Sequence, residues 1–455
     1  MRLFSWKGNK FKILNITVLS FKNTSESFKF YFLGIPCYKH TGSIPKLISE
    51  FKLNRDFDTR IFDKKIETLT RPFIPLNSEK DNRTIGFLAT SIFDMGGHSK
   101  SIKDLLHSLS DNYKQILFLT QISTSITHAP KLFNEIKKYS KIYGIDSNLL
   151  FLRKKCKNFC QEIVHNHIKV LLVYIHPDDV FGAAVLAYLK NTTDIKIIYV
   201  NHASHYPVLG MSFADVILEG TRTTEEITQR KRHFKNTKII GLQSLHKNET
   251  VYYSTEVLKE LRESLGIQPH NVISMSGGSA YKFFDGDKSA YLQMIKRLLI
   301  KDSNLVHIII TQLNQIQKRI LENIFIDTPH IRRRLIILPF QANFDKWFQI
   351  ADLFIDSFPI SSALTQVDLM RNKVPPVVKI NIERPEFSFH EYQSENYPYM
   401  FEKVEDMEKS ILTLLYDKKE RDRIVKDNYA FWLKTYESGV YKNKIISIIN
   451  VDNHE

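Results

Sequence analysis

A glycine-rich loop with a nearby lysine follows a short apolar stretch. The segment Ser274–Lys282 reads SMSGGSAYK, so Gly277 and Gly278 end the apolar stretch and Lys282 follows one helical turn later. Backbone N–H groups in such a turn suit a phosphate, and the lysine can add a point charge. An ordinary turn beside a solvated lysine is the alternative interpretation. We treat Ser276, Gly277 and Lys282 as candidate anion-binding residues.

Hydroxyl and carboxylate side chains cluster at a second predicted turn. The segment Ala351–Pro376 contains a strand that ends at Asp356, then a Ser/Pro turn and a helix. Ser362 and Thr365 fall in the first turns of that helix, where hydroxyl groups suit phosphate oxygens. Asp368 lies about one turn further along and can accept hydrogen bonds from ribose hydroxyls. The alternative is a helix cap followed by a solvated aspartate.

Three histidines follow predicted strands in the first half of the chain. His98 comes directly after Gly97, itself a candidate donor-binding residue, at the end of one strand, and His202 and His205 follow another. A general base or a phosphate-facing group is expected where parallel strands end. A single histidine there is more often structural, but three at one sheet edge favour a catalytic or acceptor-side role.

The elements that must position these residues alternate between strands and helices. Strands are predicted at Thr84–Thr90, Val170–Ile175 and Ile195–Val200, with a helix from about Pro130 to Tyr143 among the connections. A second series begins after residue 245. Its predicted strands are Val272–Met275, Val306–Thr311, Arg334–Leu338, Leu353–Asp356 and Pro376–Ile380. This alternation predicts an α/β fold with two Rossmann-like units facing across a cleft.

The composition and charge of the chain limit the classes of partner that it is expected to bind. The chain has 455 residues and is 43% hydrophobic, which suits two Rossmann-sized domains. Its net charge is +15, and residues 1–80 alone hold fifteen basic and seven acidic side chains. A basic surface favours lipid head groups, nucleic acid or phosphorylated substrates. Three cysteines (Cys37, Cys156 and Cys160) favour a reducing cytoplasm. We expect no signal peptide and no membrane helix, so any membrane contact would be peripheral.

Two other signals are weaker. Cys156 and Cys160 precede His165 and His167, but their spacing fits no standard zinc pattern. Short arginine-rich clusters occur without a recognised nucleic-acid-binding module, so nucleic acid is not an expected partner.

Four collinear segments resemble the catalytic region of O-GlcNAc transferase and its bacterial relatives. They are Arg83–Leu105, Ile195–Glu225, Val272–Leu299 and Arg334–Val378, and together they span roughly residues 83–380. The resemblance implies the GT-B fold and transfer from a nucleotide sugar, most simply a UDP-sugar. It also implies inversion at the anomeric carbon, with no catalytic metal and no further cofactor.

The resemblance also assigns roles to single residues on the donor side. Lys282 falls on a lysine that binds the donor phosphate, and Thr365 on a threonine that contacts the pyrophosphate. Asp368 falls on a ribose-binding aspartate. Phe340 and Gln341 lie where the family's backbone meets the uracil.

On the acceptor side, His98 falls on a histidine proposed to act near the acceptor. Departures from the family pattern are also visible. The family's His-Thr-Thr run is replaced by residues 363–365 (ALT), its Gly-Val-Pro glycine is absent around Asn372, and no repeat array precedes residue 83. These losses leave the sugar, the acceptor and the base open.

The expected organisation has four sections. Residues 1–80 form a small basic section, 81–245 an acceptor lobe, 246–403 a nucleotide-sugar donor lobe, and 404–455 C-terminal helices. Phe32–Pro36 (FLGIP) resembles the lead-in of some bacterial lipopolysaccharide and capsule glycosyltransferases. With the local charge, this favours a cytoplasmic enzyme at the inner membrane, contacting anionic lipid peripherally.

The acceptor is then expected to be a glycan, a lipid-linked glycan or a protein. Two alternatives remain open. One is a related transferase that moves a polyol phosphate from a CDP-linked donor. The other is a degenerate, non-catalytic partner in a glycan-assembly complex.

Overall fold

The structure is a computed structural model that describes most of the chain. It covers residues 4–7, 10–13, 16–23, 27–32, 35–41, 43–76, 81–94, 97–147, 151–244, 249–341 and 344–451, with side chains from Ile44 onward. Backbone contacts divide the chain into two compact units. Unit 1 comprises Met1–Met95, Asn112–Leu218 and Thr228–Thr237; unit 2 comprises Gly96–Asp111, Glu219–Ile227 and Lys238–Glu455. Residues 245–248, at the expected lobe junction, lie outside the described residues.

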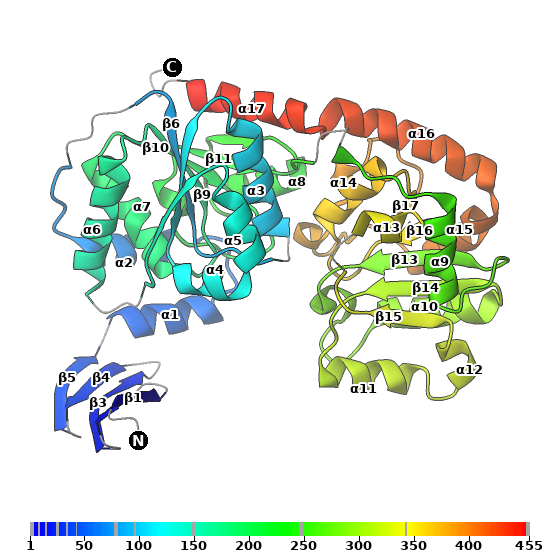
Figure 1. Ribbon diagram of the computed structural model, residues 1–455, viewed down its shortest axis with the longest axis horizontal. Coiled ribbons are helices and arrows are strands. Elements are labelled where there is room, and N and C mark those ends of the chain that lie inside the picture. The colour runs from blue at the N-terminus through cyan, green and yellow to red at the C-terminus, as the bar shows by residue number, and fades with distance from the viewer. Residues whose placement is uncertain are drawn as a thin grey trace. The chain divides into compact units, whose positions relative to one another are not determined.

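A seven-stranded sheet forms the centre of unit 1 (Figure 1). Its order is β12-β11-β10-β9-β6-β7-β8, and the neighbours from β11 through β8 run parallel. β6 (TIGFLA) is buried along its whole length, as expected for a central strand covered on both faces. The strands are β6 (Thr84–Ala89), β7 (Lys114–Leu119), β8 (Lys141–Gly144), β9 (Val170–Tyr174), β10 (Lys196–Val200), β11 (Val216–Glu219) and β12 (Thr237–Ile239).

Helices cover this sheet. The helices of unit 1 are α1 (Ser43–Leu53), α2 (Arg60–Thr70), α4 (Ile122–His128), α5 (Pro130–Ile136), α6 (Leu152–His165) and α7 (Val180–Thr192). α7 is buried almost all round and is capped by Asp179, whose carboxylate accepts from the Gly182 N–H. α6 and α7 lie on one face of the sheet and α4 and α5 on the other (Figure 1).

A small antiparallel sheet precedes these elements. Its five strands pair in chain order: β1 (Phe4–Lys7), β2 (Lys10–Ile13), β3 (Ile16–Asn23), β4 (Ser27–Phe32) and β5 (Ile35–Thr41). The predicted strands around Phe28–Pro36 are therefore part of a larger sheet. The core of unit 1 extends past the expected boundary at residue 80, because Leu47, Phe51 and Ile66 pack with residues of α6 and α7.

A six-stranded parallel sheet forms the centre of unit 2, in the order β15-β14-β13-β16-β17-β18. Apolar clusters fill the space on both of its faces. One involves α10 (Ala290–Lys301) and α15 (Val404–Tyr416), and the other involves α9 (Thr255–Ser264), α13 (Phe344–Phe348) and α14 (Ala363–Arg371). The strands are β13 (Val272–Gly277), β14 (Leu305–Ile310), β15 (Leu335–Leu338), β16 (Leu353–Ile355), β17 (Pro376–Lys379) and β18 (Met400–Phe401).

Local capping signals explain where several unit 2 helices begin. α10 starts after Ser289, whose hydroxyl accepts from the Leu292 N–H, and α11 starts with a capping box of Asn314 and Gln317. The predicted stop at Gly266 is confirmed, with φ of 71° just beyond α9. Besides the unit 1 helices already given, the helices up to Arg371 are α3 (Gly97–Leu109), α8 (Arg222–Arg230), α9 (Thr255–Ser264), α10 (Ala290–Lys301), α11 (Gln315–Ile324), α12 (Pro329–Arg332), α13 (Phe344–Phe348) and α14 (Ala363–Arg371).

Two details of the sequence prediction were wrong. The helix expected from Pro130 to Tyr143 ends at Ile136, because residues 141–144 pair with β7 as β8. The tail holds a third helix beyond the two expected up to Tyr441. Its helices are α15 (Val404–Tyr416), α16 (Lys418–Thr435) and α17 (Ser438–Asn450). None of the helices in the described ranges is long and apolar enough to cross a bilayer.

Candidate functional site

Two strand ends meet where the order of the unit 2 sheet reverses. From β13 the chain proceeds outward to β14 and β15, then returns to β16 on the other side of β13. In open α/β sheets, ligands bind outside the carboxyl ends of the strands at such a switch point. β13 ends at Gly277 and is followed by Gly278, and β16 is followed by Asp356. Both sequence segments singled out for anion binding therefore converge here.

A buried carboxylate organises the turn after β16. Asp356 is fully buried and accepts hydrogen bonds from the N–H groups of Ser357 (2.9 Å) and Ser362 (3.1 Å). The Ser361 hydroxyl and the Gln366 amide (2.9 Å) also donate to it. Burial raises the pKa of Asp356 to about 6, against the lowering effect of these donors and of Lys282. These hydrogen bonds hold the turn that connects β16 to α14.

Lys282 lies against this turn. Its Nζ donates to the carbonyl oxygen of Ser361 (2.9 Å) and to the hydroxyl of Ser362 (3.3 Å). Burial lowers the pKa of Lys282 to about 8, and the nearby charge of Asp356 opposes that shift. An ammonium has three N–H donors, so one remains beyond the two contacts made to the described residues.

Gly277 and Gly278 allow close packing of neighbouring side chains and do not act mainly as N–H donors to a phosphate. The Gly278 N–H donates to the Ile310 carbonyl (3.1 Å), so it is not available to a phosphate as the sequence had suggested. Gly278 has φ of 153°, and a Cβ there would lie 3.0 Å from the Ser362 Oγ and 3.4 Å from the Lys282 Cδ. A Cβ on Gly277 would lie 2.7 Å from the Phe344 ring. Glycine at both positions lets these side chains approach the strand end.

α14 begins directly at the site. Ser362 is its N-cap residue, and the first-turn N–H groups of a helix have no partner inside the helix. Thr365 is half-buried in the second half of that first turn. The helix N-terminus, the Thr365 hydroxyl and Lys282 together make an environment suited to a phosphate.

Asp368, one turn along α14, is held by cations. Lys100 of α3 donates to both of its carboxylate oxygens (3.3 and 3.1 Å), and the Arg371 Nη2 lies 3.7 Å from Oδ1. Arg371 is itself buried and pairs with both oxygens of Asp345 (2.9 and 2.7 Å). A carboxylate offers about four lone-pair sites, so Asp368 keeps acceptor capacity for a diol.

The remaining donor-side residues separate into two groups. Phe340 and Gln341 follow β15 at the carboxyl edge; Phe340 is 42% exposed, and the Gln341 amide donates to Pro339 O (2.9 Å). Ser276 is fully buried instead. Its hydroxyl bonds to Tyr291 and to the Ile355 carbonyl (2.6 Å), so it supports the strand end from within the core.

The three predicted histidines do not lie in one unit. His202 and His205 follow β10 in unit 1, whereas His98 is the second residue of α3 in unit 2. The His202 ring packs on Tyr174 with 6.3 Å between centroids. The loop that carries His205 is held by Arg232, whose guanidinium donates to the carbonyl oxygen of Ser204 (2.6 Å). Met95 and Gly96, next to Gly97 in the predicted turn, lie outside the described residues.

Sequence reasoning missed a histidine at the switch point of unit 1, where β9 lies beside β6. His176 follows β9, and its ring stacks on Phe93 (6.1 Å between centroids, 10° between planes). The backbone N–H of His176 donates to the Thr90 hydroxyl (2.7 Å), which in turn donates to the Asp179 carboxylate (2.7 Å). Burial lowers the pKa of His176, which favours the neutral imidazole. The signal was available, because this histidine directly follows a predicted strand.

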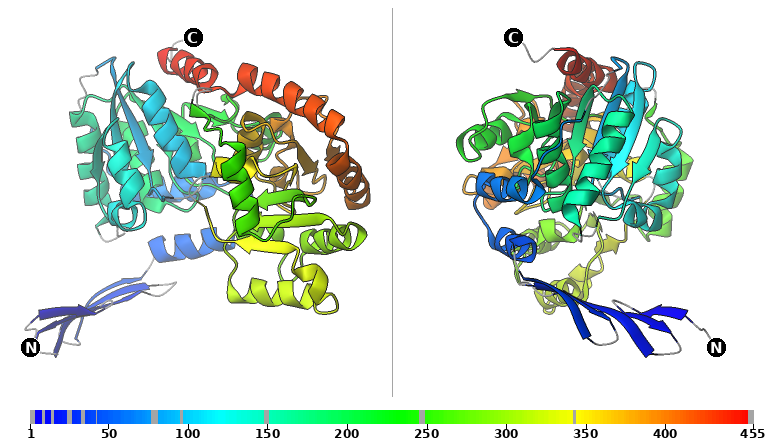
Figure 2. Two further views of the ribbon diagram at one scale, coloured as in Figure 1. Left: turned by 45° about the vertical axis from the view of Figure 1, so that its right-hand side comes forward. Right: turned by 90° about the vertical axis from the view of Figure 1, so that its left-hand side faces the viewer.

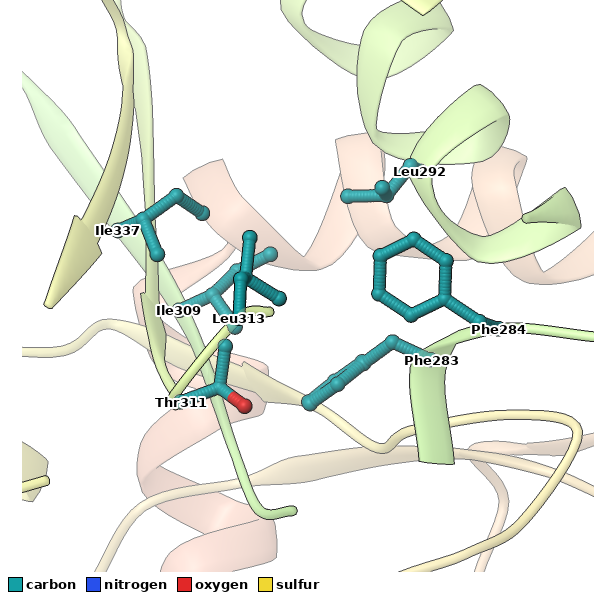
Figure 3. Close-up of a pocket in the computed structure, with 7 residues that line it drawn as sticks. All are labelled: Phe283, Phe284, Leu292, Ile309, Thr311, Leu313 and Ile337. Carbon is teal, nitrogen blue, oxygen red and sulfur yellow. The ribbon is translucent and has the colours of Figure 1, made fainter. Parts of the chain in front are cut away.

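A small apolar pocket in unit 2 is separate from these polar groups (Figure 3). Its volume is about 10 Å³, room for roughly one water molecule. Phe283, Phe284 and Leu292 face Ile309, Leu313 and Ile337 across it, with Thr311 as the polar member. This pocket is too small for a substrate. Among the described residues, no group of three or more His, Cys, Asp or Glu side chains is placed to hold a metal ion.

The sequence matches no family model and no curated protein. The fold is nevertheless similar to solved structures. HepE from Anabaena, in complex with UDP and glucose, has 14% identity and a TM-score of 0.63, covering 81% of this chain and 99% of that one. An O-GlcNAc transferase variant from Thermobaculum terrenum has 12% identity and a TM-score of 0.56, covering 89% and 75%. The lipopolysaccharide outer core galactosyltransferase WaaB has 13% identity and a TM-score of 0.56, covering 80% and 99%.

These similarities, with two parallel α/β sheets in one chain, define a protein with the GT-B glycosyltransferase fold. The α/β fold with two Rossmann-like units that the sequence predicts is therefore confirmed. At these identities the likeness establishes the fold alone.

Proposed function

We propose that the chain is a glycosyltransferase that uses a UDP-linked sugar. The observation that carries the proposal is the convergence of Lys282, the α14 N-terminus and Asp368 at the switch point of unit 2. A diphosphate leaving group needs cationic and N–H stabilisation, and a ribose needs an acceptor for its hydroxyls. HepE, which has the same fold, was solved with UDP.

Each donor-side residue then has a physical task. Lys282 donates its remaining N–H to a phosphate oxygen, and Thr365 with the first turn of α14 binds the same diphosphate. Asp368 accepts from the ribose hydroxyls, while Phe340 and Gln341 border the base. Neutralising charge on the departing diphosphate lowers the barrier to breaking the bond between the anomeric carbon and the phosphate oxygen.

On the acceptor side, a hydroxyl attacks the anomeric carbon and gives its proton to a base. The candidates are His98, His202 and His205, to which the structure adds His176. A neutral imidazole is the form that can accept a proton, which is why burial of His176 supports its inclusion. We propose an inverting reaction that needs no catalytic metal, as the family resemblance implies.

The proposed acceptor is a bacterial surface glycan precursor, free or lipid-linked, with a protein as the alternative. WaaB, of the same fold, is a lipopolysaccharide galactosyltransferase. The strongly basic N-terminal section supports work at the cytoplasmic face of the inner membrane.

The donor class can be tested by thermal stability with UDP, GDP, CDP and ADP. A nucleotide that binds only the folded state raises the melting temperature by mass action. A shift with UDP alone supports the proposal, whereas a shift with CDP alone supports the polyol-phosphate transferase. No shift with any nucleotide would contradict the proposal and favour the non-catalytic partner. Release of UDP from a panel of UDP-sugars then separates an enzyme from a degenerate binder.

A further inference from the structure

The five N-terminal strands have an unusual charge pattern. β1 to β5 contain six lysines and no aspartate or glutamate. The strands pair antiparallel in chain order, as the blue strands of Figure 2 show. In such a sheet, directly paired residues share a face and successive residues alternate between faces. The register therefore assigns every lysine to a face.

All six lysines fall on one face of the sheet. Lys7 pairs with Lys10, and Lys22 pairs with Lys29, which pairs with Lys39. Lys10 pairs with Ser20, two residues before Lys22, so both sets share a face; Lys12 alternates back to the same face as Lys10. We call this the lysine face: Lys7, Lys10, Lys12, Lys22, Lys29 and Lys39.

The opposite face collects aromatic residues. Trp6 pairs with Phe11, Phe21 with Phe30, and Phe30 with Tyr38. Phe4, Phe28 and Phe32 alternate onto that face as well. We call this the aromatic face: Phe4, Trp6, Phe11, Phe21, Phe28, Phe30, Phe32 and Tyr38. All six lysines thus lie opposite these eight aromatic residues, whereas Tyr31, which pairs with Ser20, falls on the lysine face.

Neither face is suited to water alone. Like charges directly opposite each other destabilise a sheet, and the register repeats that arrangement across β3, β4 and β5. Contiguous aromatic surface is rarely left exposed on a soluble domain. The following helix α1 contacts β4, but its buried Ile44, Leu47 and Phe51 belong to the core of unit 1.

We propose that this sheet docks on an anionic lipid bilayer. Aromatic residues, tryptophan above all, partition to the boundary between head groups and acyl chains. Basic residues on the other side of an amphipathic element are attracted to anionic head groups. The sheet has both properties. A nucleic acid or acidic glycan would use the lysine face only, and a second copy of the chain would use the aromatic face only.

Vesicle co-sedimentation of the full chain, without nucleotide, tests the lysine face. We expect binding to phosphatidylcholine vesicles containing about one third phosphatidylglycerol, weak binding to phosphatidylcholine alone, and release by salt. Each lysine near an anionic surface contributes about fivefold in affinity, so the triple variant Lys22→Gln, Lys29→Gln, Lys39→Gln should bind roughly a hundredfold more weakly.

A matched control removes the same number of lysine charges from a different part of the chain. Lys259, Lys409 and Lys418 have side chains that are 71%, 80% and 78% exposed on helices of unit 2. Replacing these three by glutamine should leave vesicle binding near that of the wild type. Both triple variants should keep the wild-type melting temperature and UDP-induced shift, so loss of docking is separable from misfolding and from failure of the proposed donor site.

Tryptophan fluorescence tests the aromatic face. Trp347 is 9% exposed and Trp432 is fully buried, so Trp6 is the tryptophan expected to respond to vesicles. A blue shift on adding anionic vesicles, lost in Trp6→Phe, supports docking. The proposal is overturned by equal binding to neutral vesicles, by equal losses in both triple variants, or by no spectral shift. It is also overturned by selective binding to nucleic acid, or by concentration-dependent dimerisation in place of vesicle binding.

Discussion

At the residue scale, the protonation of Lys282 gives the donor site a pH dependence. Burial lowers the pKa of Lys282 to about 8, and a bound diphosphate would raise it by favouring the ammonium. UDP affinity should therefore hold below pH 8 and fall by up to tenfold per pH unit above it. Lys282→Arg keeps the charge at all these pH values, so its affinity, though weaker near neutrality, should stay flat. Calorimetric titration across this range is the measurement. If the UDP affinity of the wild type is as independent of pH as that of Lys282→Arg, the Lys282 ammonium does not contribute to UDP binding.

The proposed roles of Asp368 and Lys282 can be told apart by comparing the binding of uridine and UDP. Asp368→Asn weakens an acceptor for the ribose, so it should reduce the affinities for uridine and UDP together, by about tenfold. Lys282→Met should reduce the affinity for UDP and leave uridine unchanged. Equilibrium binding of both ligands to both variants provides the comparison. If Asp368→Asn weakens UDP without affecting uridine, then Asp368 does not contact the ribose.

At the element scale, Asp356 joins the end of β16 to the first turn of α14. Replacing it by Asn keeps the shape but places an NH₂ among groups that donate hydrogen bonds. We expect the free energy of unfolding to fall by about 1–3 kcal/mol. Burial raises the pKa of Asp356 from 3.8 to about 6, so the folded state holds this proton more tightly than the unfolded chain. Its contribution to stability is full below pH 3.8 and is lost as pH rises through 6.

Denaturant unfolding of the wild type and Asp356→Asn between pH 4 and 7 checks both statements about Asp356. As the pH falls from 7 to 4, the free energy of unfolding of the wild type should rise relative to that of Asp356→Asn. A constant difference would show that Asp356 does not titrate in this window.

Gly278, directly after β13, gives a second prediction at the element scale. Gly278→Ala places a Cβ 3.0 Å from the Ser362 Oγ and 3.4 Å from the Lys282 Cδ, so these side chains must move. We expect UDP binding to weaken at least tenfold, with a stability loss of about 1–3 kcal/mol. Gly266→Ala, at a positive-φ turn with open space around it, is the control for backbone strain alone. Equal effects of both substitutions on UDP binding would contradict a role for close approach at Gly278.

At the scale of the whole molecule, the sequence predicts the sheets well because their strands are short, buried and apolar. β6, β9, β10, β13, β14 and β16 all lie where these runs placed them. β8 was missed because residues 141–144 continue a helical pattern locally and become a strand only by pairing with β7. The N-terminal sheet was only partly seen, since the register of its strands is set by pairing and not by composition.

The site was predicted less completely than the fold. The roles of Lys282, Thr365 and Asp368 were predicted from their residue types and positions and from the resemblance, and the structure brings their elements to one sheet edge. Lys100 was missed because its contact with Asp368 joins residues 268 positions apart, which one sequence cannot reveal. The burial of Ser276 was missed for the same reason: its partners Tyr291 and Ile355 are supplied by other elements.

The central claim is that the switch point of unit 2 binds the diphosphate of a UDP-sugar. Its most direct test is calorimetric titration of UDP into wild type, Lys282→Met and Lys296→Met. Lys296 is the matched control, because its ammonium also donates to a backbone carbonyl (Ile324, 2.8 Å) but lies on α10, away from the strand ends. The account predicts saturable binding that weakens at least tenfold in Lys282→Met and is unchanged in Lys296→Met. Wild-type UDP binding that Lys282→Met leaves intact, or no UDP binding at all, would contradict it.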